Sequence, residues 1–427
     1  MQPITIAIIV LVVAFIVDMP IAYGMIASSF AYLLFSGMDL SIAIEVMCSR
    51  TAGNYVILAV PLFVFAANLM NSGKITEKVF DFAKCIVGRA RGGMGHVNVI
   101  ASLIFSGMTG SAVADASGLG IMEIETMKKD GYDSGFSAAI TAASAVIGPI
   151  FPPSIPFVIY AMIAEVSVGN MFLAGMAPGV FLAIALCIYV AYISKKRNYP
   201  RSNKVTLRHF VKTTLSALPA ILTPVIILAG IYTGFATATE AAAIAGIYAL
   251  AVSVIVYHSL DVKTFWRVVK DSAKTAGQVG IMLTAAYAFS YVISLSGLPR
   301  MAGEFVGSVV TSKYSFLIIC NIMLFILGML LETSVIQLLT LPILVPIAKM
   351  YGIDLIHFGI MFSFNCMIGI CTPPFGMLIF IVTGISKEKM SVVIKELLPM
   401  VGVMIIVLLV ITFIPDSFMW LPNTFGR

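Results

Sequence analysis

The chain has 427 residues, of which 60% are hydrophobic and 11% are charged, whereas roughly a quarter of the residues in soluble domains carry a charge. Its mean hydropathy of +1.04 leaves no polar segment long enough to form a soluble domain. This composition excludes a soluble enzyme. Because the alternating pattern of a membrane β-barrel is absent, we expect an all-α membrane protein. We expect no nucleic-acid partner.

About 20 apolar residues make one helical crossing of a membrane, and ten stretches fit full crossings. They are residues 3–17, 20–37, 54–72, 136–165, 171–194, 216–234, 237–257, 277–297, 358–385 and 397–415. We interpret the first stretch as a retained span, because it has neither a basic n-region nor a cleavage site of small residues.

Four basic clusters flank these spans, at residues 74–91, 195–212, 263–274 and 387–395. Because short cytoplasmic loops are enriched in Lys and Arg, we expect all four clusters in the cytoplasm. The N-terminus and the tail after Pro415 are then periplasmic. Residues 195–215 form a cytoplasmic basic linker between two halves of the chain.

Residues 97–127 and 314–346 do not fit single crossings, since straight helices of their length would run roughly 45–50 Å against a hydrocarbon core of about 30 Å. Polar residues interrupt the first at 106–111 and the second at 332–334. If either stretch crossed the membrane, two basic clusters would lie on opposite sides. We therefore predict two re-entrant hairpins.

An internal repeat supports these hairpins. At one offset of 221 residues, Gly107-Met108 matches Gly328-Met329, Ile147-Gly148 matches Ile368-Gly369, and Pro152-Pro153 matches Pro373-Pro374. The repeats are residues 1–194 and 216–427, each with five full crossings and one hairpin. Five is an odd number, so the second copy is inverted, which is typical of secondary transporters.

Two proline motifs, residues 148–154 and 369–376, must break their helices near mid-span, because each proline removes a hydrogen-bond donor. The freed carbonyl oxygens are suitable Na⁺ ligands, and half-helix N-termini suit a carboxylate. The alternative is a proline kink used for packing. Two such motifs in repeat register, each paired with a hairpin, favour an ion and substrate site.

The hairpin tips and the breaks add hydroxyl, amide and carboxylate groups. Glu332 is the most informative, because an acid inside the membrane is costly unless it has a partner. The alternative for Glu332 is a solvated acid or a cap on the following half-helix. Glu240, at the start of a span, is more typical of an N-terminal helix-dipole partner. Our candidate substrate ligands are Ser111, Asp115, Ser154, Glu332, Ser334 and Asn365.

Two rival classes remain for comparison. An ion channel or membrane scaffold without a solute cycle is disfavoured, because a channel needs a continuous pore rather than two symmetric gates. A membrane-embedded enzyme is disfavoured too, since the sequence shows no nucleophile with a base, no Cys/His ligand cluster and no phosphate-binding loop. We expect the six cysteines to be packing residues.

Several longer motifs identify a family. They are Val60 to Phe63, Gly92 to Val99, Ser111 to Ala116, Thr141 to Ser144 and Gly148 to Pro156 in the first half, and Thr239 to Ala243 and Thr372 to Gly376 in the second. On these motifs, and over essentially its full length, the sequence resembles the large membrane subunit of tripartite ATP-independent periplasmic (TRAP) transporters, the DctM type.

The resemblance implies a multi-pass protein of the bacterial inner membrane that works as an elevator-type secondary transporter. A transport unit, about residues 92–194 and 313–427, would slide against a scaffold made of the remainder. Its partners would be a small four-span membrane subunit and a periplasmic substrate-binding protein. Uptake would be coupled to Na⁺, and the solute would be carboxylated, with sialic acid or a C4-dicarboxylate the leading choices.

Carried over by motif, the resemblance also implies Na⁺ ligands. They are oxygens of Ser106, Thr109, Gly328, Gly369 and Thr372, with a second site near Gly148, Thr333 and Met367. The sequence departs from a common form of the family, which has Asp-Pro-Thr at the second tip where this chain has Glu332-Thr333-Ser334. A substrate assigned to dicarboxylate members therefore does not transfer directly.

Overall fold

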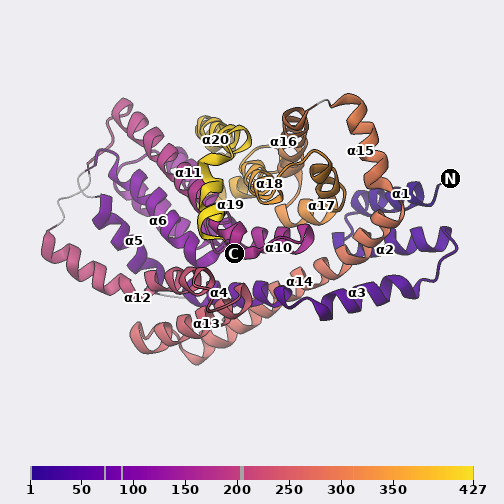
Figure 1. Cartoon of the computed structure of the whole chain (residues 1–427). Coiled ribbons are helices and arrows are strands. Elements are labelled where there is room, and N and C mark those ends of the chain that lie inside the picture. The colour runs from indigo at the N-terminus through magenta and orange to yellow at the C-terminus, as the bar shows by residue number, and fades with distance from the viewer. Residues whose placement is uncertain (1, 72–73, 88–89, 202–205, 311, 427) are drawn as a thin grey trace.

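The computed structural model describes residues 2–71, 74–87, 90–201, 206–310 and 312–426, and within these ranges it contains helices but no named strand (Figure 1). The all-α prediction is therefore confirmed. Seven helices of the described ranges are long and apolar enough to cross a membrane, and one pair bent by 68° makes an eighth candidate. Residues 202–205 of the predicted linker lie outside the described ranges.

The first half begins with two apolar helices and ends with a long one. Its helices are α1 (Pro3–Ile16), α2 (Ile21–Phe35), α3 (Ser41–Gly53), η1 (Tyr55–Leu58), α4 (Ala59–Asn71), α5 (Lys74–Val87), α6 (Gly93–Thr109), α7 (Ala112–Ser117), α8 (Leu119–Lys129), α9 (Ser134–Ala145), α10 (Ile155–Ala164) and α11 (Val168–Lys196).

The second half repeats this order. Its helices are α12 (Leu207–Tyr232), α13 (Ala238–Ala251), the π-helical turn η2 (Val252–Val256), α14 (Val262–Leu295), α15 (Leu298–Val309), α16 (Lys313–Leu330), α17 (Thr333–Met350), α18 (Leu355–Gly369), α19 (Met377–Ser386), α20 (Met390–Phe413) and α21 (Asp416–Phe425).

The offset of 221 residues found in the sequence relates these helices one by one. It carries the starts of α7 and α9, Ala112 and Ser134, onto Thr333 and Leu355, where α17 and α18 begin. It also carries the start of α3 onto Val262, so that the bent pair α3 and α4 corresponds to the single long helix α14. The repeat is thus structural, and this bend is one difference between the two copies.

Both predicted hairpins return to the side where they start. In the first, the amide of Met94 at the start of α6 donates to the hydroxyl of Tyr132, just after α8, over 3.3 Å. In the second, the rings of Phe316 in α16 and Tyr351 after α17 stack with centroids 5.2 Å apart. The end of each hairpin therefore packs beside its beginning, as re-entrance requires.

Helix α20 shows that the two hairpins enter from opposite ends. Lys128, at the base of the first hairpin, donates to the carbonyl of Ser386, just before α20 begins, over 3.0 Å. Tyr314, at the base of the second, packs its ring 6.0 Å from that of Phe413, the last residue of α20. Since 24 residues of helix span about 36 Å, the bases lie far apart and the repeat is inverted.

Several predicted crossings differ in detail from the structure. The spans predicted at 136–165 and 358–385 are pairs of half-helices, α9 with α10 and α18 with α19. The helices α11 and α12 extend into the predicted linker from both sides, and α14 continues through the basic cluster at 263–274. The short helices α3, α5, α15 and α21 were not predicted, because they are too short or too amphipathic to register as crossings.

All four basic clusters come together at one end of the molecule. Arg91 bonds to Asn198 over 3.0 Å, and the amide of Gly92 donates to the carbonyl of Pro200 over 3.1 Å. Asn68, just before the first cluster, donates to Ser272 within the cluster at 263–274 over 2.9 Å. This grouping is what the parity argument requires, and that the end faces the cytoplasm stays a prediction.

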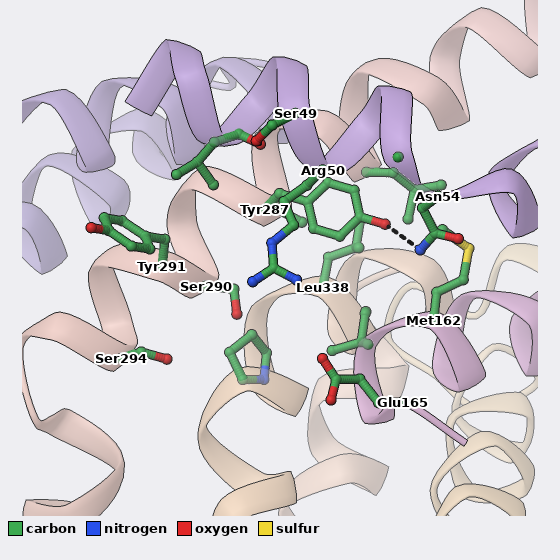
Figure 2. A pocket seen from close by; sticks show the side chains of 16 residues that line it. Ser49, Arg50, Asn54, Met162, Glu165, Tyr287, Ser290, Tyr291, Ser294 and Leu338 are labelled. Carbon is green, nitrogen blue, oxygen red and sulfur yellow. Dashed lines mark hydrogen bonds between the residues drawn. The ribbon is translucent and has the colours of Figure 1, made fainter. Parts of the chain in front are cut away.

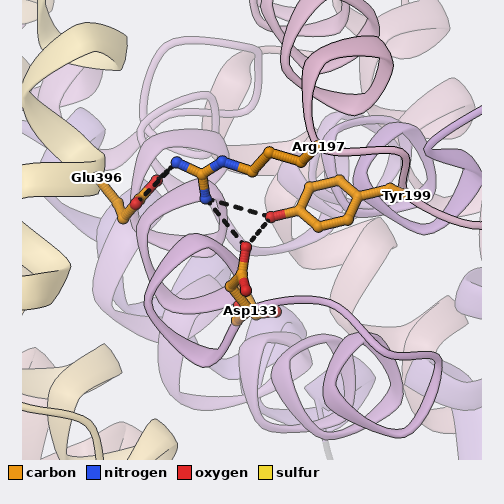
Figure 3. Close-up of polar contacts among 5 residues, drawn as sticks. Asp133, Arg197, Tyr199 and Glu396 are labelled. Carbon is orange, nitrogen blue, oxygen red and sulfur yellow. Dashed lines mark hydrogen bonds and ion pairs between the residues drawn. The ribbon is translucent and has the colours of Figure 1, made fainter.

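A polar network joins the two repeats at this end (Figure 3). The Arg197 guanidinium, which follows α11, donates to both carboxylate oxygens of Glu396 in α20 over 2.9 and 2.8 Å, and to Asp133, which precedes α9, over 3.1 Å. The Tyr199 hydroxyl donates to Asp133 over 2.5 Å. Burial and this hydrogen bond raise the pKa of Tyr199 above its ordinary value.

Replacing Arg197 should therefore weaken the packing of the two repeats. We expect Arg197→Gln to lower the free energy of unfolding by about 1–2 kcal/mol. This value already includes a reduction for screening by solvent, because the Arg197 side chain is 31% exposed. Thermal unfolding of the detergent-purified chain measures this. The control is Arg300→Gln, whose pair with Glu304 is exposed and should matter little. Equal unfolding midpoints for the two variants would contradict the assignment.

Candidate functional site

The first hairpin tip packs backbone against backbone on the first helix break. Helix α6 ends at Gly110, whose φ of +60° and whose contact with Pro153 both exclude a side chain: a Cβ would lie 2.6 Å from the Pro153 carbonyl oxygen. Similarly, a Cβ on Gly148 would lie 3.3 Å from the carbonyl of Ser111. The glycines therefore allow the tip to reach the break.

The second tip meets the second break even more closely. A Cβ on Gly369 would lie 2.4 Å from the Cα and the carbonyl carbon of Gly328, which leaves room for glycine alone. After Gly369 the chain leaves helix α18, and the Thr372 hydroxyl donates to the carbonyl of Ile368 over 2.8 Å. Each break contains a cis peptide bond between its two prolines.

Glu332 caps the half-helix that follows the second tip. Its carboxylate accepts from the amide of Ser334 over 3.1 Å and from the Ser334 hydroxyl over 3.0 Å. A carboxylate at this position also compensates the positive end of the dipole of α17. The capping alternative considered for Glu332 is thus what the structure shows. Glu240 likewise forms a capping box with Thr237 at the start of α13.

Both tips open onto one cavity of about 550 Å³, which we name the central cavity. Its walls are the two tips, the start of α10, part of α18 and the second break, and, across from them, the start of α2 and residues 275–283 of α14. A volume of several hundred Å³ suits a small organic solute. Its polar lining is Tyr23, Ser111, Thr275, Gln278, Glu332, Thr333 and Ser334.

The structure divides the six candidate substrate ligands into two groups. Ser111, Glu332 and Ser334 line the central cavity. Ser154 does not, because its hydroxyl caps α10 and donates to the carbonyl of Pro149 over 2.5 Å. Asn365 also points elsewhere: its amide donates to the carbonyl and side-chain oxygens of Asn321 in α16 over 2.8 and 2.7 Å. Neither side chain lines the central cavity in this structure, and a role for either in binding substrate stays a prediction.

Asp115, the sixth candidate, is only 1% exposed and lies beneath the tip rather than at the cavity wall. Below the tip, α6 and α9 are joined by buried polar side chains. The Asn98 amide donates to Thr141 over 2.7 Å, and the Ser144 hydroxyl donates to the side-chain oxygen of Asn98 over 2.7 Å. Asp115 therefore belongs to the interior of the first hairpin.

The candidate Na⁺ ligands group by repeat. Ser106 and Thr109 lie on the last turn of α6 beside the first break, near Gly148, whereas Gly328, Gly369 and Thr372 meet at the second break. Thr333 and Met367 are also in the second group, with the Thr333 hydroxyl 4.0 Å from the Met367 sulfur. Which of these oxygens bind the same ion stays a prediction.

Residues from the other side of the cavity were missed. Thr275 and Gln278 come from α14, and Tyr23 comes from α2, all outside the hairpins and breaks on which the sequence analysis concentrated. The available signal was Gln278 itself, an amide within the apolar stretch that was predicted to cross at 277–297.

Comparison with known proteins agrees with this architecture. Residues 8–417 match the family "Tripartite ATP-independent periplasmic transporter, DctM component". A sialic acid TRAP transporter large permease protein of Vibrio cholerae is 38% identical over 410 residues, covering 95% of both chains. A C4-dicarboxylate TRAP transporter large permease protein of Pseudomonas aeruginosa is 33% identical over 402 residues, covering 94% of both.

A likeness to a solved structure supports the fold. The YdaH transporter of Alcanivorax borkumensis superposes with a TM-score of 0.69 over 90% of both chains, at 13% sequence identity. Together with the match to 95% of a relative at 38% identity, the inverted repeat and its two hairpins settle the family. The chain is a multi-pass inner-membrane protein and belongs to the DctM component family of tripartite ATP-independent periplasmic transporters.

Proposed function

We propose that this chain carries out Na⁺-coupled uptake of a carboxylated solute, bound in the central cavity between the two hairpin tips. The observation that carries the proposal is that both tips meet helix breaks beside the same cavity. Carbonyl oxygens at a break and hydroxyls at a tip are the ligands Na⁺ takes in such transporters. The alternative function, an ion channel, would not require a contact between a hairpin tip and a helix break in each repeat.

Buried oxygen atoms support cation binding at each break. The Thr109 hydroxyl is buried and has no hydrogen-bond partner among the described residues. The Thr372 hydroxyl gives its proton to Ile368, so its oxygen remains free to accept a cation. Two cations moving down 100 mV would supply about 4.6 kcal/mol, of which a solute with one negative charge would consume about 2.3 kcal/mol, leaving enough for roughly fortyfold accumulation.

The cavity favours a solute with a single carboxylate. Among the described residues that line it, Glu332 is the only charged one, and a second carboxylate on the solute would meet this acid at close range. Hydroxyl and amide groups, in contrast, can bond to Glu332, Ser111 and Gln278. Relatives named for sialic acid are 38% and 37% identical, and we therefore favour a sialic acid over a C4-dicarboxylate.

The proposal includes partners and a motion. A periplasmic substrate-binding protein delivers the solute, and a small four-span membrane subunit completes the membrane part. The transport unit, built around the two hairpins, slides as an elevator against the scaffold that contributes α2 and α14 to the cavity. Support comes from the family, whose description is tripartite, and from a cavity whose two walls belong to these different parts.

The Na⁺ concentration that gives half-maximal uptake tests the ion site. Thr372→Val and Ser106→Ala each remove a side-chain oxygen from one break with little change in shape, and we expect each to raise that concentration severalfold in proteoliposomes. The matched control is Thr340→Val, because the Thr340 hydroxyl makes the same bond to a carbonyl four residues earlier, in α17 away from the break. If both variants behave like the control, only backbone oxygens remain as ligands.

A further inference from the structure

A second and larger cavity, of about 650 Å³, lies outside the proposed solute site (Figure 2). We name it the outer cavity. Helix α3 and the second half of α14 form one side, and the end of α10 and residues of α17 form the other. Its polar lining is Ser49, Arg50, Asn54, Glu165, Tyr287, Ser290, Tyr291 and Ser294.

The outer cavity adjoins the central cavity and lies toward the end of the molecule opposite the basic clusters. Leu283 and Leu338 line both cavities. Helix α14 starts at the basic end, lines the central cavity from Thr275 and reaches the outer cavity as far as Ser294. With the basic end in the cytoplasm, the outer cavity faces the periplasm, from which the solute comes.

Arg50 provides a positive charge in the outer cavity, and no carboxylate forms an ion pair with it among the described residues. Within the described ranges, no acid lies within ion-pair distance of Arg50, and Figure 2 shows its guanidinium directed into the cavity with Glu165 across the space. A planar guanidinium with five donors matches a carboxylate in two parallel hydrogen bonds. An unpaired Arg in a polar cavity is therefore suited to an anion that enters it.

Neighbouring side chains hold this arrangement in place and add donors. The Asn54 amide donates to the hydroxyl of Tyr287 over 3.1 Å, so that Tyr287 can give its own proton to a bound molecule. Thr51 and Thr284 bond over 3.1 Å and tie α3 to α14 next to Arg50. Ser290, Tyr291 and Ser294 continue a row of hydroxyls along α14.

We propose that the outer cavity is a first binding site for a small, hydroxylated monocarboxylate on its way to the central cavity. Arg50 binds the carboxylate, the hydroxyls of α14 bind the solute's hydroxyl groups, and Glu165 accepts from its remaining donors. Glu165 also disfavours a second carboxylate at the far side. The inference rests on the proposed function for the direction of uptake, but its binding step needs neither Na⁺ nor transport.

The test measures access of charged reagents to one cysteine in the cavity. The six native cysteines are replaced by serine, Ser294→Cys is added, and the full chain is reconstituted in vesicles of phosphatidylcholine only, so that no anionic lipid competes for Arg50. The reagents are the sulfonatoethyl and the trimethylammonioethyl methanethiosulfonates. The quantity compared is the rate at which the anionic reagent labels the cysteine, divided by the rate for the cationic reagent. We expect Arg50→Gln to lower this ratio at least about threefold, because a charged cleft concentrates ions of opposite sign.

Two controls and one ligand complete the experiment. Arg50→Lys keeps the charge and should keep the ratio, and Arg300→Gln removes a charge outside the cavity and should not change it. N-acetylneuraminate should slow labelling when Arg50 is present and lose this effect in Arg50→Gln. A ratio unaffected by Arg50→Gln, or undiminished protection in that variant, would overturn the proposal. Because labelling is done without an ion gradient, a failed Na⁺ dependence of uptake would leave this result unaffected.

Discussion

Solute uptake should fall at least about tenfold in Gly369→Ala. The methyl group would stand 2.4 Å from the Cα of Gly328, so the second hairpin tip must move away from the second break. Overpacking of this kind costs about 1–3 kcal/mol, and both partners here are backbone atoms that cannot change rotamer. The measurement is initial uptake by the complete transporter in proteoliposomes at saturating Na⁺.

Gly384→Ala is the matched control for this prediction. Gly384 lies in α19, on the other side of the same break, and a Cβ there meets nothing within 4 Å. Helix propensity favours alanine at that position by roughly 1 kcal/mol, so expression and uptake should be normal. If Gly369→Ala transports as well as Gly384→Ala, the contact between tip and break has no role in the cycle.

The purified chain reconstituted alone should not accumulate solute at all. The chain has no polar segment that could form a soluble capture domain, and its family is one component of a tripartite system. We expect accumulation of N-acetylneuraminate to return only when both the small membrane subunit and the periplasmic binding protein are supplied. Uptake by the single chain at the rate of the complete system would refute this prediction.

Omitting one component at a time makes this second experiment more informative. Without the binding protein, solute reaches the cavities only by free diffusion, so uptake should be absent at low solute concentration. Without the small subunit, the membrane part of the tripartite system is incomplete, and uptake should be absent at any concentration. Uptake that needs the binding protein alone would contradict the role given to the small subunit.

The sequence predicted the repeat, the hairpins and the breaks because each depends on local chemistry. Gly148 and Gly369, each followed by a pair of prolines, disfavour a continuous helix through local chemistry, and the offset between them needs no knowledge of packing. The same offset of 221 residues then fits helix boundaries that the motifs themselves do not mark, such as the starts of α9 and α18.

The direction of side chains around the site could not be predicted in the same way. Asn365 faces Asn321 and Asp115 lies beneath the first tip because α16 and α9 cover them, and these contacts join segments far apart in the sequence. Sequence position alone placed both residues near a break or a tip, which is correct. Only the packing of other helices decides which of their faces meets the cavity.

The wall shared by the two cavities determines how the protein prevents leaks. Leu283 belongs to the helix proposed to stay fixed and Leu338 to a hairpin proposed to move, and both are almost fully buried. Where two cavities adjoin, a constriction of apolar side chains excludes water and ions by staying dry rather than by charge. As the hairpin moves, this apolar contact must be replaced by another one before water fills the gap. The permeability of the protein to water and ions therefore depends on unbroken apolar packing around these two leucines.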